Sequence, residues 1–181
     1  MHMKFVLQAI LMSFLICAIL PIADVYRVNA ATITVPDNYS NIQEAINHAN
    51  PGDTISVKAG TYNESIVVNK TLSLVGENMA TTILNGTMIV EANNVNVSGF
   101  AFRGWSSGIF LNTTTGVNIA KNSIIFNAIG IDVENSSSVT MESNVMNGSG
   151  LDNIGILLAY SSGCRIINNT ITNALYWGIR I

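Results

Sequence analysis

Short segments in which apolar and polar residues alternate recur along the chain from residue 32 onward. In the second half they form three series, whose copies follow one another at intervals of 22 to 25 residues. The three series are Gly108–Leu111, Gly130–Val133, Gly155–Leu158 and Gly178–Ile181; Val117–Ile119, Val139–Met141 and Cys164–Ile166; and Asn122–Ile124, Asn144–Met146 and Asn169–Ile171. Such strict alternation over a few residues indicates β-strands that each bury one face.

The three series predict a coil with three strands in each repeat. Earlier segments with the same alternation are Thr54–Val57, Ser65–Val68, Thr71–Leu74, Val95–Val97 and Phe100–Phe102. One such strand cannot bury its apolar face alone, whereas stacked repeats bury all three series in one interior. The sequence therefore predicts an all-β fold, a right-handed single-stranded parallel β-helix of about five to six coils. A sandwich of antiparallel hairpins is the main alternative, but hairpins would not keep three series in step.

Two kinds of residue recur at fixed places in the repeat. Asn122, Asn144 and Asn169 share one position, and we expect them to form a structural ladder of hydrogen bonds at a corner. We expect the glycines that open the first series to be corner residues with a positive φ; they are Gly108, Gly130, Gly155 and Gly178. Cys164 aligns with Val117 and Val139, so it is predicted to be a small buried core residue.

The segment before the repeats predicts a short capping helix. Ser40 and Gln43 have the spacing of a capping box, and Pro51–Gly52 ends the segment. The apolar face of this helix is formed by Ile42, Ala45, Ile46 and Ala49. A helix laid over the open end of a coil covers its exposed strand edges. We expect His48, on the same helix, to face solvent.

The first thirty residues have the features of an export signal. Residues 5–23 are almost continuously apolar after Lys4, and Val28–Ala30 fits a signal peptidase site. We therefore divide the chain into a signal peptide at 1–30 and a β-helix domain at 31–181. An uncleaved N-terminal anchor is the alternative, because the apolar run is nearly long enough to span a bilayer. The chain is predicted to be exported: extracellular, on the cell surface or periplasmic. No cap follows the last strand, so we expect the domain to be truncated at its C-terminus.

Composition narrows the function classes. Of 181 residues, 49% are hydrophobic and 10% are charged, with a net charge of −3, which excludes a disordered protein and gives no basic surface for nucleic acid. Nine Asn-X-Ser/Thr sequences occur, and both chance and glycosylation explain them.

The N-terminal part resembles a known family. Ile33–Pro36, Ile42–Ile46, Pro51–Val57, Gly60–Tyr62 and Leu72–Gly76 resemble the opening of right-handed β-helix proteins of the pectin-lyase-like type. Within that type, the chain is similar to the β-helix domain of the NosD-type periplasmic copper-binding protein and to archaeal cell-surface β-helix proteins. The resemblance implies the fold, but one fold carries many functions. The Arg-x-x-Pro signature of the lyases and the Gly-His-Gly element of the polygalacturonases are both missing. No ligand motif supports calcium or copper either, so we expect no cofactor, with calcium and copper as the alternatives.

Two sets of side chains are candidates for chemistry. Asp132 and Glu134 lie two residues apart and are expected on one outward face, with Arg180 two turns away. All three are candidate catalytic residues. The two carboxylates are also candidate calcium ligands. The candidates for stacking on sugar rings are Trp105, Tyr160, Tyr176 and Trp177.

These residues lead to three functional hypotheses. The first is an exported non-catalytic scaffold or binding module whose partners are carbohydrate or other cell-envelope components. The second is a polysaccharide lyase or hydrolase that uses the candidate catalytic residues. The third is a NosD-like accessory in the maturation of a copper site, which rests on the resemblance alone. Nucleic acid is not expected as a partner, and a membrane is expected only through an uncleaved N-terminal segment.

Overall fold

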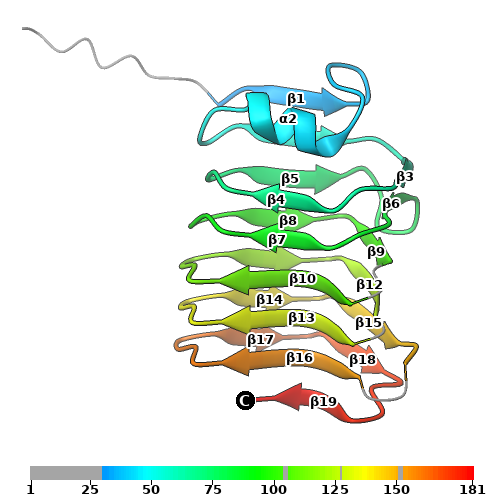
Figure 1. The fold of residues 1–181 in the computed structure, drawn as a ribbon, viewed down its shortest axis with the longest axis vertical. Helices are drawn as coiled ribbons and strands as arrows, with labels where there is room; N and C mark the ends of the chain where they lie inside the picture. The colour runs from blue at the N-terminus through cyan, green and yellow to red at the C-terminus, as the bar shows by residue number, and fades with distance from the viewer. Residues whose placement is uncertain (1–29, 104–105, 127, 151–152) are drawn as a thin grey trace, which may run out of the picture.

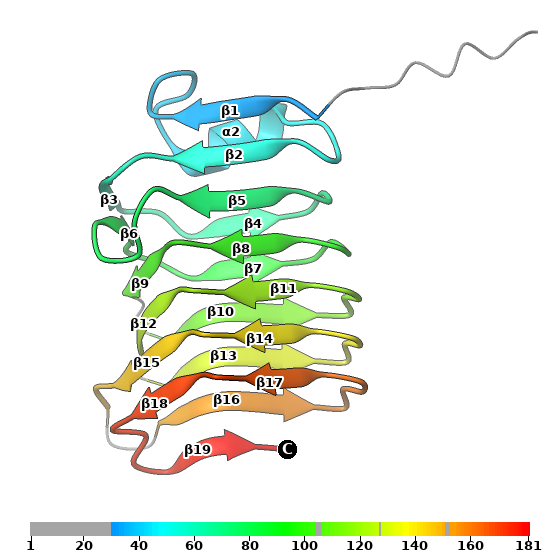
Figure 2. The ribbon, with the colours of Figure 1, turned by 180° about the vertical axis from the view of Figure 1, so that it is seen from behind.

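A computed structural model describes residues 30–103, 106–126, 128–150 and 153–181. The chain winds into a solenoid of three parallel sheets (Figures 1 and 2). Sheet A contains β1 (Thr32–Val35), β2 (Thr54–Val57), β5 (Ser73–Gly76), β8 (Asn96–Ser98), β11 (Asn118–Ala120), β14 (Thr140–Glu142) and β17 (Arg165–Ile167). Sheet B contains β3 (Gly60–Tyr62), β6 (Thr82–Leu84), β9 (Ala101–Arg103), β12 (Ser123–Phe126), β15 (Val145–Gly148) and β18 (Thr170–Thr172). Sheet C contains β4 (Ile66–Val68), β7 (Met88–Val90), β10 (Ser107–Asn112), β13 (Ile129–Glu134), β16 (Ile154–Ala159) and β19 (Trp177–Arg180).

The chain visits sheets A, B and C in that order in each turn. The predicted parallel β-helix with three strands per turn is confirmed, and its right-handed sense stays a prediction. There are about seven turns, one more than predicted, because the first turn lacks the repeat pattern. It contains β1 and the helix α2 (Ile42–His48), which takes the place of a sheet C strand.

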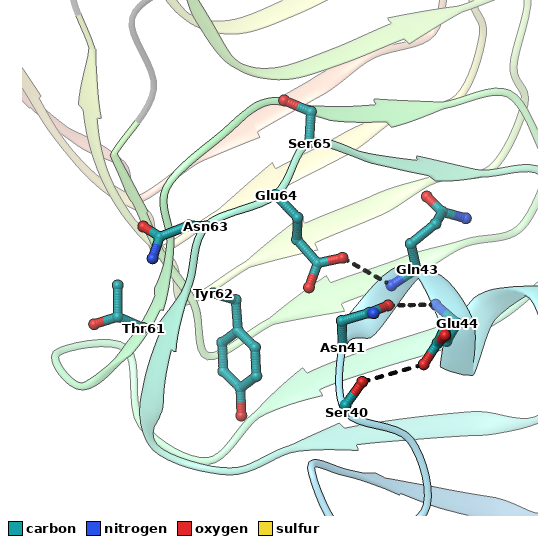
Figure 3. Close-up of a pocket in the computed structure, with 9 residues that line it drawn as sticks. All are labelled: Ser40, Asn41, Gln43, Glu44, Thr61, Tyr62, Asn63, Glu64 and Ser65. Atoms are coloured by element: carbon teal, nitrogen blue, oxygen red, sulfur yellow. Dashed lines mark hydrogen bonds between the residues drawn. The ribbon is translucent and has the colours of Figure 1, made fainter.

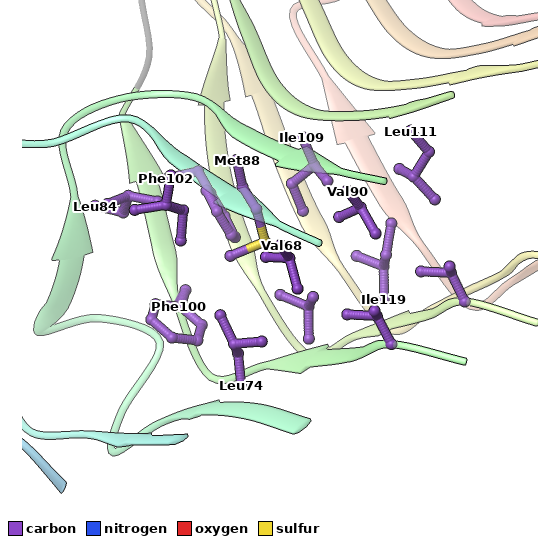
Figure 4. Close-up of a cluster of buried hydrophobic side chains, with 14 of the residues drawn as sticks. Val68, Leu74, Leu84, Met88, Val90, Phe100, Phe102, Ile109, Leu111 and Ile119 are labelled. Atoms are coloured by element: carbon purple, nitrogen blue, oxygen red, sulfur yellow. The ribbon is translucent and has the colours of Figure 1, made fainter. Parts of the chain in front are cut away.

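The interior is filled by apolar columns from all three sheets (Figure 4). The strand register places Val117, Val139 and Cys164 directly above one another in three successive turns. Val117 and Val139 are buried as predicted, but Cys164 is only half-buried. It lies in the last of the described turns, and among the described residues a turn packs against it on one side only.

The three repeated asparagines lie in one hydrogen-bonded row inside the corner between sheets A and B. Nδ2 of Asn122 donates to Oδ1 of Asn144 at 3.1 Å, and Nδ2 of Asn144 donates to Oδ1 of Asn169 at 3.0 Å. The backbone N–H of Phe100 opens the row with a bond to Oδ1 of Asn122 at 3.0 Å. The left-handed backbone lies one residue earlier, at Lys121, Ser143 and Asn168, with φ between 52° and 55°. The asparagines therefore serve as side-chain partners of the corner, while their neighbours make the turn.

The prediction for the repeated glycines is wrong. Gly108, Gly130, Gly155 and Gly178 lie within β10, β13, β16 and β19, and none has a positive φ. At three of them the space is too small for a side chain: a Cβ on Gly130 would lie 2.5 Å from the carbonyl oxygen of Gly155, for example. Close approach of neighbouring turns, rather than backbone conformation, explains the first three glycines. Gly178 has open space around its Cβ position.

The helix α2 covers the first strand of sheet C, as Figure 1 shows. Its apolar face is buried as predicted, but its N-cap is Asn41 rather than Ser40. Asn41 accepts a bond from the backbone of Glu44 at 2.8 Å, whereas the Ser40 hydroxyl bonds only to the Glu44 side chain. His48 is exposed, as expected.

Side chains join α2 to the next turn at three points. The Gln43 side chain accepts from the N–H of Val67 at 2.7 Å and donates to its carbonyl at 3.3 Å, so it pairs with the free edge of β4 as a strand would. Glu64 accepts from two backbone N–H groups at the start of the helix. Lys70 donates to three carbonyls at its end. The helix is therefore a cap whose own ends are satisfied by the turn beneath it.

The predicted signal peptide falls almost wholly on residues 1–29, outside the described part of the chain. In the part that is described, no helix has the length and apolar character needed to cross a bilayer.

Candidate functional site

One column of side chains runs down the outer face of sheet C. The register aligns Val67, Ile89, Phe110, Asp132, Leu157 and Arg180, one from each strand between β4 and β19. We call these six residues the outer column. Because neighbouring parallel strands lie about 4.8 Å apart, the column extends over about 24 Å. Four of its six members are apolar although they point away from the core, and Asp132 stands among them.

Asp132 is buried although it lies on the outside of the solenoid. Its side chain projects between those of Phe110 and Leu157 in the turns on either side, and only 7% of the residue is exposed. Within the described residues, its Oδ1 atom is buried without a hydrogen-bond partner. Carboxylate oxygens in such surroundings are normally paired, because an unpaired buried charge is costly. The site therefore has a hydrogen-bond acceptor without a partner, Oδ1 of Asp132, between two apolar side chains.

The surroundings of Asp132 change its acidity. Loss of water by burial, and to a smaller extent repulsion from the Glu134 carboxylate, raises the pKa of Asp132 to about 6. The carboxyl group therefore holds a proton in a substantial fraction of molecules at slightly acidic pH. A ligand that donates a hydrogen bond to Oδ1 would relieve the cost of the ionised form.

The other two predicted catalytic residues flank this position. Glu134 occupies the next outward position of β13, where it aligns with Asn112 and Ala159. By strand geometry, its carboxyl lies about 7 Å from that of Asp132. Arg180 is exposed and lies two turns from Asp132, about 10 Å away by strand spacing. The fold thus brings all three to one face, with Arg180 too far away for a direct ion pair.

The predicted stacking residues do not form one group. Tyr160 is 93% exposed and, with Leu157 and Arg180, lines a hollow of about 350 Å³ at the end of the outer column. Tyr176 and Trp177 contact each other edge to face, with ring centroids 5.7 Å apart, where β19 begins. Trp105 lies outside the described residues. Tyr160 is therefore the aromatic candidate that the described structure joins to the outer column.

A second hollow, of about 530 Å³, was not indicated by the sequence (Figure 3). It lies between the start of α2 and the turn around Tyr62, and its walls are mainly polar. Figure 3 shows the Glu64 carboxylate directed at the start of the helix, where its oxygens bond to backbone N–H groups at 2.8 and 3.0 Å. Asn41 and Ser40 likewise bond to the helix. These polar groups are engaged in capping, so we take the outer column as the candidate site.

The fold and the outer column can now be compared with known proteins. Residues 46–181 match the family described as periplasmic copper-binding protein (NosD). The chain belongs to the NosD family.

Two similar proteins extend the comparison beyond the NosD family match. A cell surface glycoprotein of Methanothermus fervidus is 37% identical over 94 residues, which cover 48% of this chain and 16% of that protein. The chain thus spans a small part of the relative's length. A solved structure of Geobacillus virus E2 ORF18 matches with a TM-score of 0.53 over 73% of this chain and 38% of that one, at 13% identity. That likeness supports the solenoid fold alone.

The copper named in the NosD family description does not fit the donors that the structure describes. Copper is held mainly by His, Cys and Met side chains. His48 stacks on Tyr39 in the cap, whereas Cys164 lies in the last turn. Met88, Met141 and Met146 are fully buried in the apolar core. Among the described residues, no group of three or more His, Cys, Asp or Glu side chains could hold a metal ion. We therefore derive no chemistry through copper.

Proposed function

We propose that the chain is an exported, non-catalytic β-solenoid module that binds carbohydrate along the outer column of sheet C. Three observations support export. The family is described as periplasmic, one relative is named a cell surface glycoprotein, and the first thirty residues have the pattern of a signal peptide.

The observation that carries the binding proposal is the unpaired Oδ1 atom of Asp132 in an apolar frame. Sugar rings have apolar C–H faces and hydroxyl groups at their edges. The faces fit side chains such as Phe110 and Leu157. A hydroxyl would donate to Oδ1 of Asp132 once these neighbouring side chains move apart, because Oδ1 is buried in the structure. Ligand sites commonly combine apolar walls with a few polar groups that fix orientation. The repeating turns, about 4.8 Å apart, offer an extended ligand a straight path along the sheet.

Binding to soluble polysaccharide released from the envelope of the producing cells tests this proposal, with calorimetry as the measurement. Phe110→Ala and Asp132→Leu should each weaken binding by about tenfold or more, the equivalent of about 1.4 kcal/mol. Asp132→Leu replaces a buried carboxylate with an apolar side chain like its neighbours, so the fold should become more stable while binding falls. Asn118→Ala is the matched control and should bind normally. Asn118 lies on the outside of sheet A, in the same turn as Asp132 but on another face of the solenoid. Absence of binding, or equal binding by all four proteins, would exclude the outer column as a carbohydrate site.

A polysaccharide lyase or hydrolase is the second candidate, because the pKa of Asp132 is raised to about 6. A carboxyl group with such a pKa can act as a general acid near neutral pH, with Glu134 as its partner about 7 Å away. The release of unsaturated or reducing ends from polygalacturonate, with and without calcium, separates the two functions. The binding proposal expects no turnover. Turnover that Asp132→Ala and Glu134→Ala abolish would establish the enzyme instead.

A further inference from the structure

The nine Asn-X-Ser/Thr sequences are distributed unevenly over the surface. In eight of them the asparagine is exposed: Asn38, Asn63, Asn69, Asn85, Asn96, Asn135, Asn147 and Asn168. The ninth, Asn112, is half-buried on the outside of sheet C. None of the nine belongs to the buried set Asn122, Asn144 and Asn153. In a strand, residues i and i+2 point to the same side, so Asn96 and Ser98, which both belong to β8, lie on the same outer surface.

We propose that the exposed asparagines, above all Asn63, Asn85 and Asn147, carry N-linked glycans, an inference that rests on the export part of the proposed function. These three occupy one outward column along sheet B. The complete column is Asn63, Asn85, Arg103, Ile125, Asn147 and Thr172, and every member is exposed. Glycans attached there would project into solvent from one corner of the solenoid. The outer column of sheet C contains no such sequence, so its surface stays free for a ligand.

The hydrogen bonds of these asparagines leave room for a sugar on Nδ2. Oδ1 of Asn63 accepts from Nδ2 of Asn85 at 2.9 Å, and Oδ1 of Asn147 accepts from Nδ2 of Asn173 at 2.8 Å. Within the described residues, Nδ2 of Asn63 and of Asn147 makes no hydrogen bond. A glycosylated asparagine keeps its Oδ1 and one N–H, so Asn85 would also keep its bond to Asn63. The folded structure is therefore compatible with glycans at all three positions.

The transfer requires a donor and an enzyme from the cell. The donor is an oligosaccharide linked through phosphate to a membrane lipid, and the enzyme is a membrane oligosaccharyltransferase. Nδ2 of asparagine forms a bond to the anomeric carbon and loses one proton to a base of the enzyme. The bond between the anomeric carbon and the phosphate oxygen breaks, and the lipid phosphate leaves with the electron pair.

The Thr hydroxyls of two of these sequences are hydrogen-bonded in the folded chain. The hydroxyl of the second residue after the asparagine must be free to contact the transferase. In the folded chain, the Thr87 hydroxyl of the Asn85 sequence donates to the carbonyl of Ser107 in the next turn at 2.8 Å. The Thr71 hydroxyl of the Asn69 sequence donates in the same way to Asn93 at 2.9 Å. Transfer to Asn85 or Asn69 therefore requires that the hydroxyl first leaves this carbonyl, while the asparagine itself is exposed in the folded chain.

Peptide mass spectrometry of the chain isolated from the cells that produce it tests this proposal. Peptides containing Asn63, Asn85 and Asn147 should carry sugar on the asparagine, and the peptide containing Asn112 should not. Asn112 is half-buried on the outside of sheet C, whereas the other three are exposed. Thr87→Ala should abolish the glycan at Asn85 and leave those at Asn63 and Asn147. Thr87→Ser, which keeps the hydroxyl, should retain all three.

Cell fractionation of the same sample separates this inference from the proposed function. A chain outside the cytoplasm whose nine asparagines are all unmodified would overturn the glycosylation proposal and leave export intact. A chain confined to the cytoplasm would overturn export itself. Modification at Asn112 with none at the three exposed positions would also contradict the proposal, because exposure would then not govern the site.

Discussion

At the scale of single residues, Asp132 shows how a surface position becomes a buried one. Strand alternation directs its side chain outward, and Phe110 and Leu157 in the adjacent turns then remove most of its contact with water. A carboxylate in this position is less stable than in solvent, and its pKa rises to about 6. The free energy of unfolding must therefore depend on the protonation of this group.

Asp132→Asn should remove a pH-dependent loss of stability. The folded pKa of Asp132 is raised above its ordinary value, so the folded state binds the proton more tightly than the unfolded state. Below about pH 4, Asp132 is protonated in both states and does not lower the free energy of unfolding. The free energy of unfolding then falls as the pH rises to about 6, and above that pH the loss is constant. Its full size is about 2–3 kcal/mol, because one pKa unit corresponds to about 1.4 kcal/mol. Urea unfolding of the unmodified chain and of Asp132→Asn between pH 4 and 8 measures this loss of stability. A difference in stability that stays flat over this range would contradict the burial of the carboxylate.

At the scale of the strand, the repeated glycines permit neighbouring turns to approach closely. Gly130 in β13 lies against the backbone of Gly155 in β16, and Gly155 lies against Gly178 in β19. The same strands contribute the outer column. Their role depends on contact between turns, which a conformational preference alone does not reveal.

Gly130→Ala should destabilise the solenoid, whereas Gly178→Ala should not. The added Cβ at position 130 would lie 2.5 Å from a backbone oxygen, so strands must move apart. Overpacking of this kind costs about 1–3 kcal/mol. At Gly178 no atom lies within 4 Å of the added Cβ, and φ is not positive. The alanine there should be neutral or stabilise by up to about 1 kcal/mol, because it restricts the unfolded chain. Equal midpoints for the two variants in chemical unfolding would rule out close packing at Gly130.

At the scale of the whole molecule, stability arises from contacts between successive turns. From the second turn on, successive turns pair through three sheets, and the asparagine row adds side-chain bonds across the fifth, sixth and seventh turns. The helix α2 covers the first strand of sheet C, where Gln43 satisfies the backbone of Val67. A defect in the middle of such an array should therefore affect turns on both sides of it.

Asn144→Ala should destabilise the chain more than Asn169→Ala. Oδ1 of Asn144 accepts from both the backbone N–H and the Nδ2 of Asn122, and the residue is completely buried. Each buried group left without a partner costs about 1–3 kcal/mol, so we expect a loss of about 2–4 kcal/mol. Asn169 is partly exposed, and water can replace its bonds at a lower cost. Thermal or urea unfolding of the two variants measures the difference, and a larger loss at Asn169 would contradict a ladder whose strength depends on burial.

The three-stranded repeat could be predicted from the sequence alone. The spacing of the three series predicted three strands per turn, the stacking of Val117 on Val139 and the shared position of the three asparagines. These features were predictable because each turn pairs in parallel register with the next, so the structural repeat is also a sequence repeat. The outward direction of Asp132 and Glu134 followed from strand alternation in the same way.

Which of those positions form the candidate site could not be predicted, because it depends on contacts between turns. Alternation gives the side of a residue, whereas burial depends on its neighbours one turn away, about 22 to 25 residues distant in sequence. The burial of Asp132, the tight spacing at Gly130 and the pairing of Gln43 with β4 all depend on such contacts. The same reason explains why Cys164, aligned with two buried valines, is half-buried: among the described residues, a turn packs against it on one side only.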